Sequence, residues 1–235
     1  MRRIPAAARR LLVHEVTLGT SFVRWVTRRG PHGARPGETT VAYAAGQTAI
    51  LFGLLFASVV ETVVLALIIP WPIVHAVTLV LDVWGVYFVI ALHASCVVRP
   101  HVVAGGSLRL RYGALLDVRI PAGSIAAVRA QRKYVGSKFG APDDDGVACV
   151  AVAGETTVLV ELSTPVRFVR VLGAPAEASA FRFYADDSSA AVAAITAVMA
   201  AADRRVTAEA LDATNPEAAA RLRDEAALLD GVVHP

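Results

Sequence analysis

Residues 41–98, VAYAAGQTAILFGLLFASVVETVVLALIIPWPIVHAVTLVLDVWGVYFVIALHASCVV, contain two long apolar runs separated by Pro70-Trp71-Pro72. Each run exceeds the roughly 20 residues that an α-helix needs to cross the ~30 Å hydrocarbon core of a bilayer. Proline ends the first helix and begins the second, because it has no backbone N–H to donate. The stretch therefore predicts a transmembrane helical hairpin, and with it a multi-pass integral membrane protein whose first partner is the lipid bilayer.

The composition of the whole chain agrees with this prediction. The 235 residues are 55% hydrophobic and only 18% charged, a combination that is rare in soluble domains of this size. Residues 1–140 carry 16 basic and 5 acidic side chains, whereas residues 141–235 carry 7 basic and 15 acidic ones. The basic part includes the hairpin and its flanks, which suits contact with anionic lipid headgroups. No Lys/Arg run with interleaved aromatic residues is present, so nucleic acid is not an expected partner.

The charges beside the hairpin predict its orientation. Eight arginines precede the first run, and Arg99, Arg109 and Arg111 follow the second, while the connecting turn carries no charge. Positive residues in short flanks remain on the cytoplasmic side. We therefore expect both termini in the cytoplasm and Trp71 at the outer surface of the plasma membrane. The chain has only two cysteines, too few for a disulfide framework.

Residues 1–40 fall into two parts. A basic and apolar segment over about residues 5–27 has the spacing of an amphipathic helix, and polar residues within it argue against a cleaved signal peptide. We expect this helix to lie in the membrane interface, with Phe22 and Trp25 on its apolar side; the alternative is a helix that packs on the later domain. A Gly/Pro-rich linker follows over residues 30–40. The apolar face of the predicted helix comprises Leu12, Val16, Gly19, Val23 and Val26.

Two carboxylates interrupt the hairpin. Glu61 lies ten residues before Trp71 and Asp82 eleven residues after it, so an antiparallel hairpin brings both to a similar depth, roughly 15 Å from the turn. A charged carboxylate at that depth is costly and is expected to face protein or water. One interpretation is a proton or cation site in an oligomer, made by two carboxylates that cannot both ionise cheaply. The alternative is structural: both are protonated, or they bond to a polar residue of the hairpin or of a second copy, such as Gln47, Ser58, Thr62 or Thr78.

After about residue 101 the apolar pattern changes to the period of two that is typical of β-strands. In SLRLRYG, residues 107–113, the leucines and the arginines alternate between two faces. Further strands are expected at residues 115–121, 124–132, 146–153, 156–162, 165–173 and 179–185. A helix follows, with an apolar face made of Ala191, Val192, Ile195, Val198, Met199 and Ala202. We expect an α+β domain over residues 99–202, with seven mainly antiparallel strands, and a helical tail over residues 203–235 that contains a second helix from Asn215-Pro216.

The segment RPHVVAGGSLRLRYGALLDVRIPAGSIAAVRAQR, residues 99–132, resembles the opening of bacterial PH-like domains found in small membrane proteins. Those proteins place a short transmembrane hairpin before a strand of the form xLxLRYG, a tight glycine turn and a strand that ends in Ile-Pro. The matching residues are Leu108, Leu110, Arg111, Gly113, Ile120, Pro121, Ile125 and Val128. The resemblance covers about residues 99–202 and implies a cytoplasmic, seven-stranded bent β-barrel capped by a C-terminal helix. Eukaryotic PH domains bind phosphoinositides with a basic loop that is reduced here to Gly113-Ala114, so specific inositol-lipid binding is not expected.

No catalytic, metal-binding or cofactor motif is present: GxSxG, HExxH, CxxC, Walker and GxGxxG patterns are all missing. The acidic run at residues 143–145 lacks the alternating ligand spacing of a calcium loop. We therefore expect a non-enzymatic protein without a cofactor.

The expected function is that of a membrane-anchored interaction or scaffold module, which presents a PH-like domain to the lipid surface, to an unidentified protein or to a second copy. The basic residues expected to face anionic headgroups are Arg99, Arg109, Arg111, Arg129, Arg132, Lys133 and Lys138. The alternative function is an oligomeric proton- or cation-handling membrane protein that uses Glu61 and Asp82.

Overall fold

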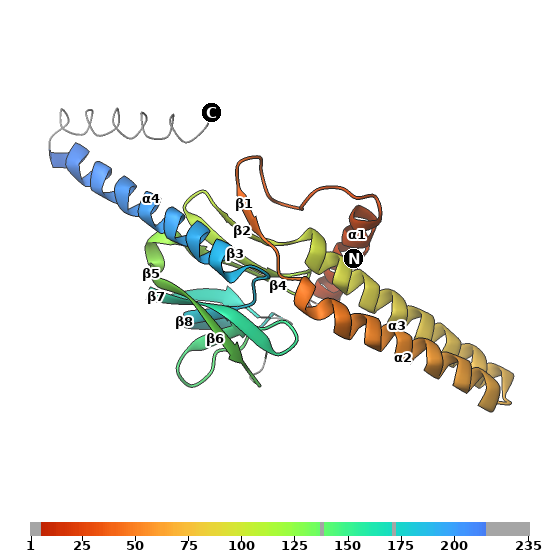
Figure 1. Cartoon of the computed structure of the whole chain (residues 1–235). Helices are drawn as coiled ribbons and strands as arrows, with labels where there is room; N and C mark the ends of the chain where they lie inside the picture. The colour runs from red at the N-terminus through yellow and green to blue at the C-terminus, as the bar shows by residue number, and fades with distance from the viewer. Residues whose placement is uncertain (1–5, 137–138, 171–172, 215–235) are drawn as a thin grey trace.

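Four α-helices and two four-stranded β-sheets make up the part of the chain that the computed structural model describes, residues 6–136, 139–170 and 173–214. The fold class is α+β, as expected. Figure 1 shows two long helices that project to one side of the sheets, and a third helix that leaves them on the other side. The helices are α1 (Ala6–Val26), α2 (Ala45–Ile68), α3 (Pro72–Val98) and α4 (Ser188–Thr214).

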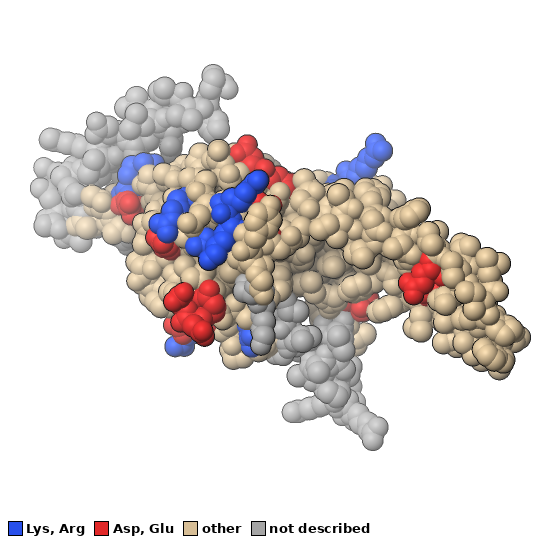
Figure 2. All heavy atoms as spheres, turned by 60° about the horizontal axis from the view of Figure 1, so that its bottom comes forward, with Lys and Arg blue, Asp and Glu red and all other residues tan. Residues whose placement is uncertain are grey.

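Helices α2 and α3 form a hairpin around Pro70-Trp71-Pro72. Pro72 is the first residue of α3, where its missing N–H leaves no hydrogen bond unmade. The mean hydropathy reaches 2.5 in α2 and 2.0 in α3, and both helices are long and apolar enough to cross a membrane. Their large side chains stay uncovered: Leu67 is 82% exposed and Ile73 80%. In Figure 2 the hairpin surface carries few charges, whereas basic and acidic groups gather over the sheets.

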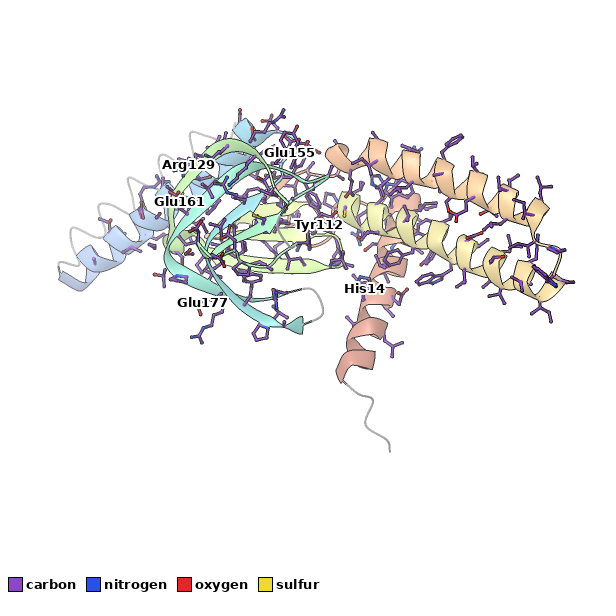
Figure 3. All side chains as sticks on the ribbon, turned by 90° about the horizontal axis from the view of Figure 1, so that it is seen from below. His14, Tyr112, Arg129, Glu155, Glu161 and Glu177 are labelled. Carbon is purple, nitrogen blue, oxygen red and sulfur yellow. The ribbon has the colours of Figure 1, made fainter. Side chains whose placement is uncertain are left out.

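Helix α1 has the predicted bounds to within one residue and crosses α3 at a steep angle (Figure 3). It packs on α3 through Phe22, whose ring meets the edge of the Tyr87 ring at 5.8 Å, and its Leu18 is fully buried. The structure thus places α1 on the hairpin. The alternative interpretation had placed it on the later domain. Four side chains of the predicted apolar face, Leu12, Val16, Val23 and Val26, are between 55% and 63% exposed.

The first sheet is antiparallel in the order β1-β2-β3-β4. Its first strand comes from before the hairpin and pairs with a strand that follows it. Residues 39–41 were expected to be the end of a linker and the start of the first membrane helix, so α2 begins later than expected, at Ala45. The strands are β1 (Thr39–Val41), β2 (His101–Ala104), β3 (Ser107–Tyr112) and β4 (Leu116–Pro121).

The second sheet has the order β5-β7-β8-β6, and β6 runs parallel to β8 while the other pairs are antiparallel. A short 3-10 turn, Ala122–Ser124, connects the two sheets. One long strand, β7, replaces two predicted ones, and the pairing is irregular between Glu161 and Val166, where the sequence suggested a break. The strands are β5 (Ile125–Tyr134), β6 (Val147–Val150), β7 (Glu155–Val169) and β8 (Pro175–Phe183).

Both sheets and α4 contribute to one buried core. Leu110 comes from the first sheet, Phe181 from the second and Ile195 from α4, and none of them is more than 1% exposed. The predicted apolar face of the closing helix is confirmed for Ala191, Val192, Ile195, Val198 and Met199, and α4 continues beyond residue 202 to Thr214. The second predicted C-terminal helix lies outside the described residues. No strand pair joins the two sheets within the described ranges, so a closed seven-stranded barrel is not confirmed.

Candidate functional site

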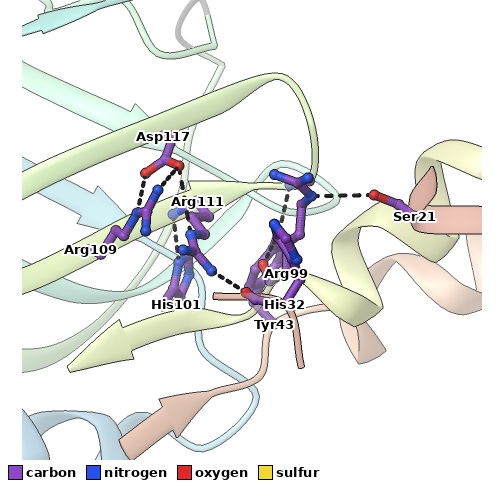
Figure 4. A network of polar contacts seen from close by, with 9 residues as sticks. Ser21, His32, Tyr43, Arg99, His101, Arg109, Arg111 and Asp117 are labelled. Atoms are coloured by element: carbon purple, nitrogen blue, oxygen red, sulfur yellow. Dashed lines mark hydrogen bonds and ion pairs between the residues drawn. The ribbon is translucent and has the colours of Figure 1, made fainter. Parts of the chain in front are cut away.

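A buried polar junction, which comprises Tyr43, Arg99, His101, Arg111 and Gly113, joins the end of α3 to the first sheet (Figure 4). The Tyr43 side chain is 1% exposed, and its hydroxyl accepts a hydrogen bond from the Gly113 N–H at 2.7 Å. The same hydroxyl donates to the Arg99 carbonyl at 3.1 Å. Because these groups come from the segment before α2, the end of α3 and the turn after β3, the hydroxyl fixes all three parts together.

Gly113 occupies a position that only glycine suits. Its φ of +48° lies in the left-handed region, which side chains disfavour. A Cβ at this position would also collide with Ser95 and lie against Cys96, both in the last turns of α3. The turn between β3 and β4 therefore packs against the side chains of α3 with no room for a Cβ.

His101 is a buried, neutral histidine. Its Nδ1 accepts a hydrogen bond from the Arg111 N–H, and its Nε2 donates to the Tyr184 carbonyl, both at 3.0 Å. This pattern requires the tautomer that carries its proton on Nε2. Burial lowers the pKa of His101 to about 4, because the charged ring is costly without water. Its ring also stacks on that of Tyr43 at 4.4 Å, so the residue holds the junction together as a neutral group.

Arg111 lies within the junction rather than on the surface, which corrects the expectation that it faces lipid headgroups. Its side chain is 2% exposed, since the loop after α1 covers it. Its Nη1 donates to the His32 carbonyl at 2.8 Å, and the His32 N–H donates to the carbonyl of Val98, the last residue of α3. Burial, with Arg109 nearby, lowers the pKa of Arg111 from its ordinary value. The loop is thus fixed between β3 and α3.

Two further arginines of the predicted set extend the junction outward. Arg109 makes a two-pronged ion pair with Asp117, at 2.7 Å and 2.6 Å, and this hydrogen bonding raises the pKa of Arg109. Arg99 is partly buried, and its Nε donates to the Ser21 hydroxyl of α1 at 3.3 Å. Arg99 therefore links α1 to the end of α3.

The remaining predicted basic residues lie elsewhere. Arg129 pairs with Glu161 at 2.6 Å on the second sheet (Figure 3), and Arg132 pairs with Glu155 at the same distance. Lys133 is exposed on β5, and Lys138 lies outside the described residues. The described members of the predicted set therefore fall into two groups: Arg99, Arg109 and Arg111 gather at the junction, and Arg129, Arg132 and Lys133 lie on the second sheet.

Glu61 and Asp82 have different surroundings in the hairpin. Asp82 accepts a hydrogen bond from the Thr62 hydroxyl at 3.1 Å within the hairpin, which is one of the contacts that the structural alternative expected. Glu61 is exposed on the surface of α2. Another polar residue of the hairpin, Gln47, accepts from the Tyr112 hydroxyl of β3 at 3.1 Å and so belongs to the contact between the helices and the sheet.

Several residues of the junction, and His32 of the loop bonded to it, were not predicted. Tyr43 stands within the first apolar run and was assigned to the membrane helix, and His32 was assigned to the linker. One local signal was present for Tyr43: it follows Thr39-Thr40-Val41, a run rich in strand-forming residues. His101 follows Pro100 at the point where the strand pattern begins, but nothing local shows that its ring is buried.

Comparison with known proteins finds no matching family model, no matching curated protein and no matching solved structure.

Proposed function

We propose that this protein is a membrane-anchored, non-enzymatic interaction module. The α2–α3 hairpin spans the plasma membrane, both termini lie in the cytoplasm, and the two-sheet domain is a PH-like domain held against the inner surface. One observation carries the proposal: a hairpin whose apolar side chains are uncovered is joined to a folded domain by a buried junction at one end. A monomeric soluble protein rarely leaves so large an apolar surface bare.

The way in which the domain is attached supports a role in presentation rather than simple tethering. Tyr43, Gly113 and Arg99 connect the domain to α3 through buried hydrogen bonds. A flexible linker would let the domain rotate freely, whereas this junction holds it in one orientation to the hairpin. A fixed orientation means that the same face of the domain always meets the membrane.

Helix α1 supports the same placement. It crosses α3 near the domain end of the hairpin (Figure 3), and the Trp25 ring meets the His93 ring of α3 edge-on at 6.2 Å. If the hairpin stands across the bilayer, α1 lies along the bilayer surface, and the exposed Leu12, Val16 and Val23 have apolar surface to bury there. Amphipathic helices in this position bury their apolar face at the boundary between headgroups and acyl chains.

Washing membranes with alkaline carbonate tests the anchoring directly. The full chain is expressed in a bacterial host, and its membranes are washed first with carbonate and then with detergent. We expect the protein to stay in the membrane pellet through the carbonate wash and to be released by detergent alone. Recovery in the carbonate supernatant, beside an integral marker that stays in the pellet, would refute the spanning hairpin.

A further inference from the structure

A cavity of about 350 Å³ opens on the outer face of the first sheet, beneath the loop that precedes β1. The share of liquid volume that a water molecule occupies is about 30 Å³, so a phosphate group and several waters fit within it. The loop forms its roof with Gly33 and Arg35. The sheet forms its floor with Ser107, Arg109 and Arg119.

The strand register of this floor sets two positive charges against each other. Arg109 on β3 lies directly opposite Arg119 on β4, and like charges in this position destabilise a sheet. Asp117 neutralises Arg109 through the two-pronged ion pair. Arg119 donates only to the neutral hydroxyl of Ser107, at 3.2 Å. Among the described residues, no ion pair neutralises Arg119 in the same way.

Two carboxylates near the cavity are Glu38 and Asp117. In the part of the chain that the structure describes, no carboxylate forms an ion pair with Arg119 or with Arg35. Glu38 lines the cavity and brings one negative charge to it: its carboxylate accepts a hydrogen bond from the neutral Arg35 backbone N–H at 2.8 Å, while Arg35, Arg109 and Arg119 bring three positive charges. Asp117 is shared, because its Oδ2 also lies 3.7 Å from the Nε of the buried Arg111.

The positive field of this region also acts on a neighbouring group. Partial desolvation, followed by the charges of Arg99, Arg24, Arg111 and Arg109, lowers the pKa of His32. A histidine that arginines make harder to protonate lies in a positive potential. The region therefore attracts an anion, and the cavity offers the room for one.

We propose that this cavity binds a phosphate group, which the guanidinium groups of Arg119 and Arg35 hold. Guanidinium groups match the geometry of phosphate oxygens and form charge-assisted hydrogen bonds with them. The bound anion also relieves the repulsion between Arg109 and Arg119. The ligand is either the headgroup of an anionic phospholipid or a free phosphate.

This inference rests on the proposed function, because the proposed membrane determines which phosphate groups are near. The roof loop is bonded to the end of α3: the His32 N–H donates to the Val98 carbonyl at 2.7 Å, and Arg111 donates to the His32 carbonyl. If α3 spans the bilayer, its last residue lies at the level of the headgroups. The cavity then opens beside the lipid phosphates of the inner leaflet.

Thermal unfolding of the full chain in maltoside micelles, which contain no phosphate, tests the site. One arm adds inorganic phosphate against chloride at equal ionic strength, and the other adds short-chain phosphatidylglycerol against short-chain diacylglycerol. Ligands that bind the folded state raise the melting temperature. We expect Arg119→Gln to weaken binding on the order of tenfold, and Arg129→Gln, on the second sheet, to leave it unchanged.

The Arg119 variants also test the repulsion between Arg109 and Arg119. Arg119→Gln removes a like charge opposite Arg109, so the ligand-free protein is expected to melt at the same or a higher temperature while it loses phosphate affinity. Arg119→Lys keeps the charge and is expected to retain part of the binding. If Arg119→Gln folds normally but loses phosphate binding, Arg119 belongs to a ligand site and does not have a structural role.

Each outcome has a defined meaning. Stabilisation by phosphatidylglycerol alone supports a headgroup site, and stabilisation by inorganic phosphate, alone or with the lipid, supports a site for the phosphate group itself. No stabilisation in either arm, or equal weakening by Arg129→Gln and Arg119→Gln, overturns the inference. If no phosphate binds but the protein stays in the membrane through the carbonate wash, the proposed function still stands. If carbonate releases the protein, the proposed function is wrong, even where inorganic phosphate binds.

Discussion

The hydroxyl of Tyr43 accepts a 2.7 Å hydrogen bond from the backbone N–H of Gly113, which lies 70 residues further along the chain. The whole α2–α3 hairpin lies between these two residues. This buried contact, together with the pairing of β1 and β2, connects the segment that enters the hairpin with the sheet that follows it. This contact makes the hairpin and the domain one mechanical unit.

Tyr43→Phe tests the contribution of this contact to stability. The substitution keeps the ring but leaves the Gly113 N–H buried without a partner, which costs about 1–3 kcal/mol. We expect the free energy of unfolding of the full chain in micelles to fall by that amount. Tyr134→Phe is the matched control, because Tyr134 is 72% exposed, and it is expected to change little. Equal stability of the two variants would contradict the role assigned to Tyr43.

Gly113→Ala tests how closely the domain approaches α3. Gly105 offers a control with a similar backbone, since its φ is +58° but nothing lies near its missing Cβ. Both substitutions carry the cost of a side chain in the left-handed region, roughly 1–2 kcal/mol. Only Gly113→Ala also collides with Ser95, and overpacking of this kind costs about 1–3 kcal/mol more. Denaturant unfolding of both variants gives the difference, and no difference would show that the turn does not touch α3.

The stability of the protein is expected to depend on pH through His101. Its pKa is about 4 in the folded protein and 6.5 in the unfolded chain, so the unfolded state binds the proton more readily. The contribution of the neutral ring is fully present above pH 6.5 and is lost as the pH falls towards about 4. The shift corresponds to about 3 kcal/mol. His101→Gln removes this part of the pH dependence, and the difference between the two stability profiles measures it; parallel profiles would exclude His101.

Helix α1 is expected to place Trp25 at the membrane interface. The chain has three tryptophans, so Trp71→Phe combined with Trp84→Phe leaves Trp25 as the sole fluorophore. In vesicles that contain brominated lipids, we expect stronger quenching by bromines near the headgroup than by bromines at the end of the acyl chain. Quenching by neither lipid would mean that α1 faces water.

Local periodicity explains why much of the fold could be predicted. The hairpin, the alternation of Leu108 and Leu110 with Arg109 and Arg111, and the apolar face of α4 all depend on residues close together in the sequence. Strand β1 could not be found in this way, because its three residues become a strand only by pairing with β2, which lies beyond the hairpin. The merging of two predicted strands into β7 likewise depends on its partner β8.

The candidate site was harder to predict for the same reason. The alternation of the sequence places Arg111 on the outer face of β3, and the structure has it on that face. The loop after α1 covers its side chain there, which the alternation does not show. Helical rise placed Glu61 and Asp82 at a similar depth but could not show the rotation of each helix. The rotation turns Asp82 towards Thr62 and leaves Glu61 exposed. Burial and side-chain partners depend on contacts that span the chain, and the sequence pattern does not contain them.

Labelling of single cysteines in intact cells tests the central claim, a spanning hairpin with its turn outside and its domain inside. The two native cysteines are buried, so the parent chain supplies the background for a membrane-impermeant maleimide. We predict that Trp71→Cys is labelled in intact cells, and that Ala126→Cys, on an exposed position of β5, is labelled only after permeabilisation. Labelling of Ala126→Cys in intact cells, or protection of Trp71→Cys until permeabilisation, would contradict this topology.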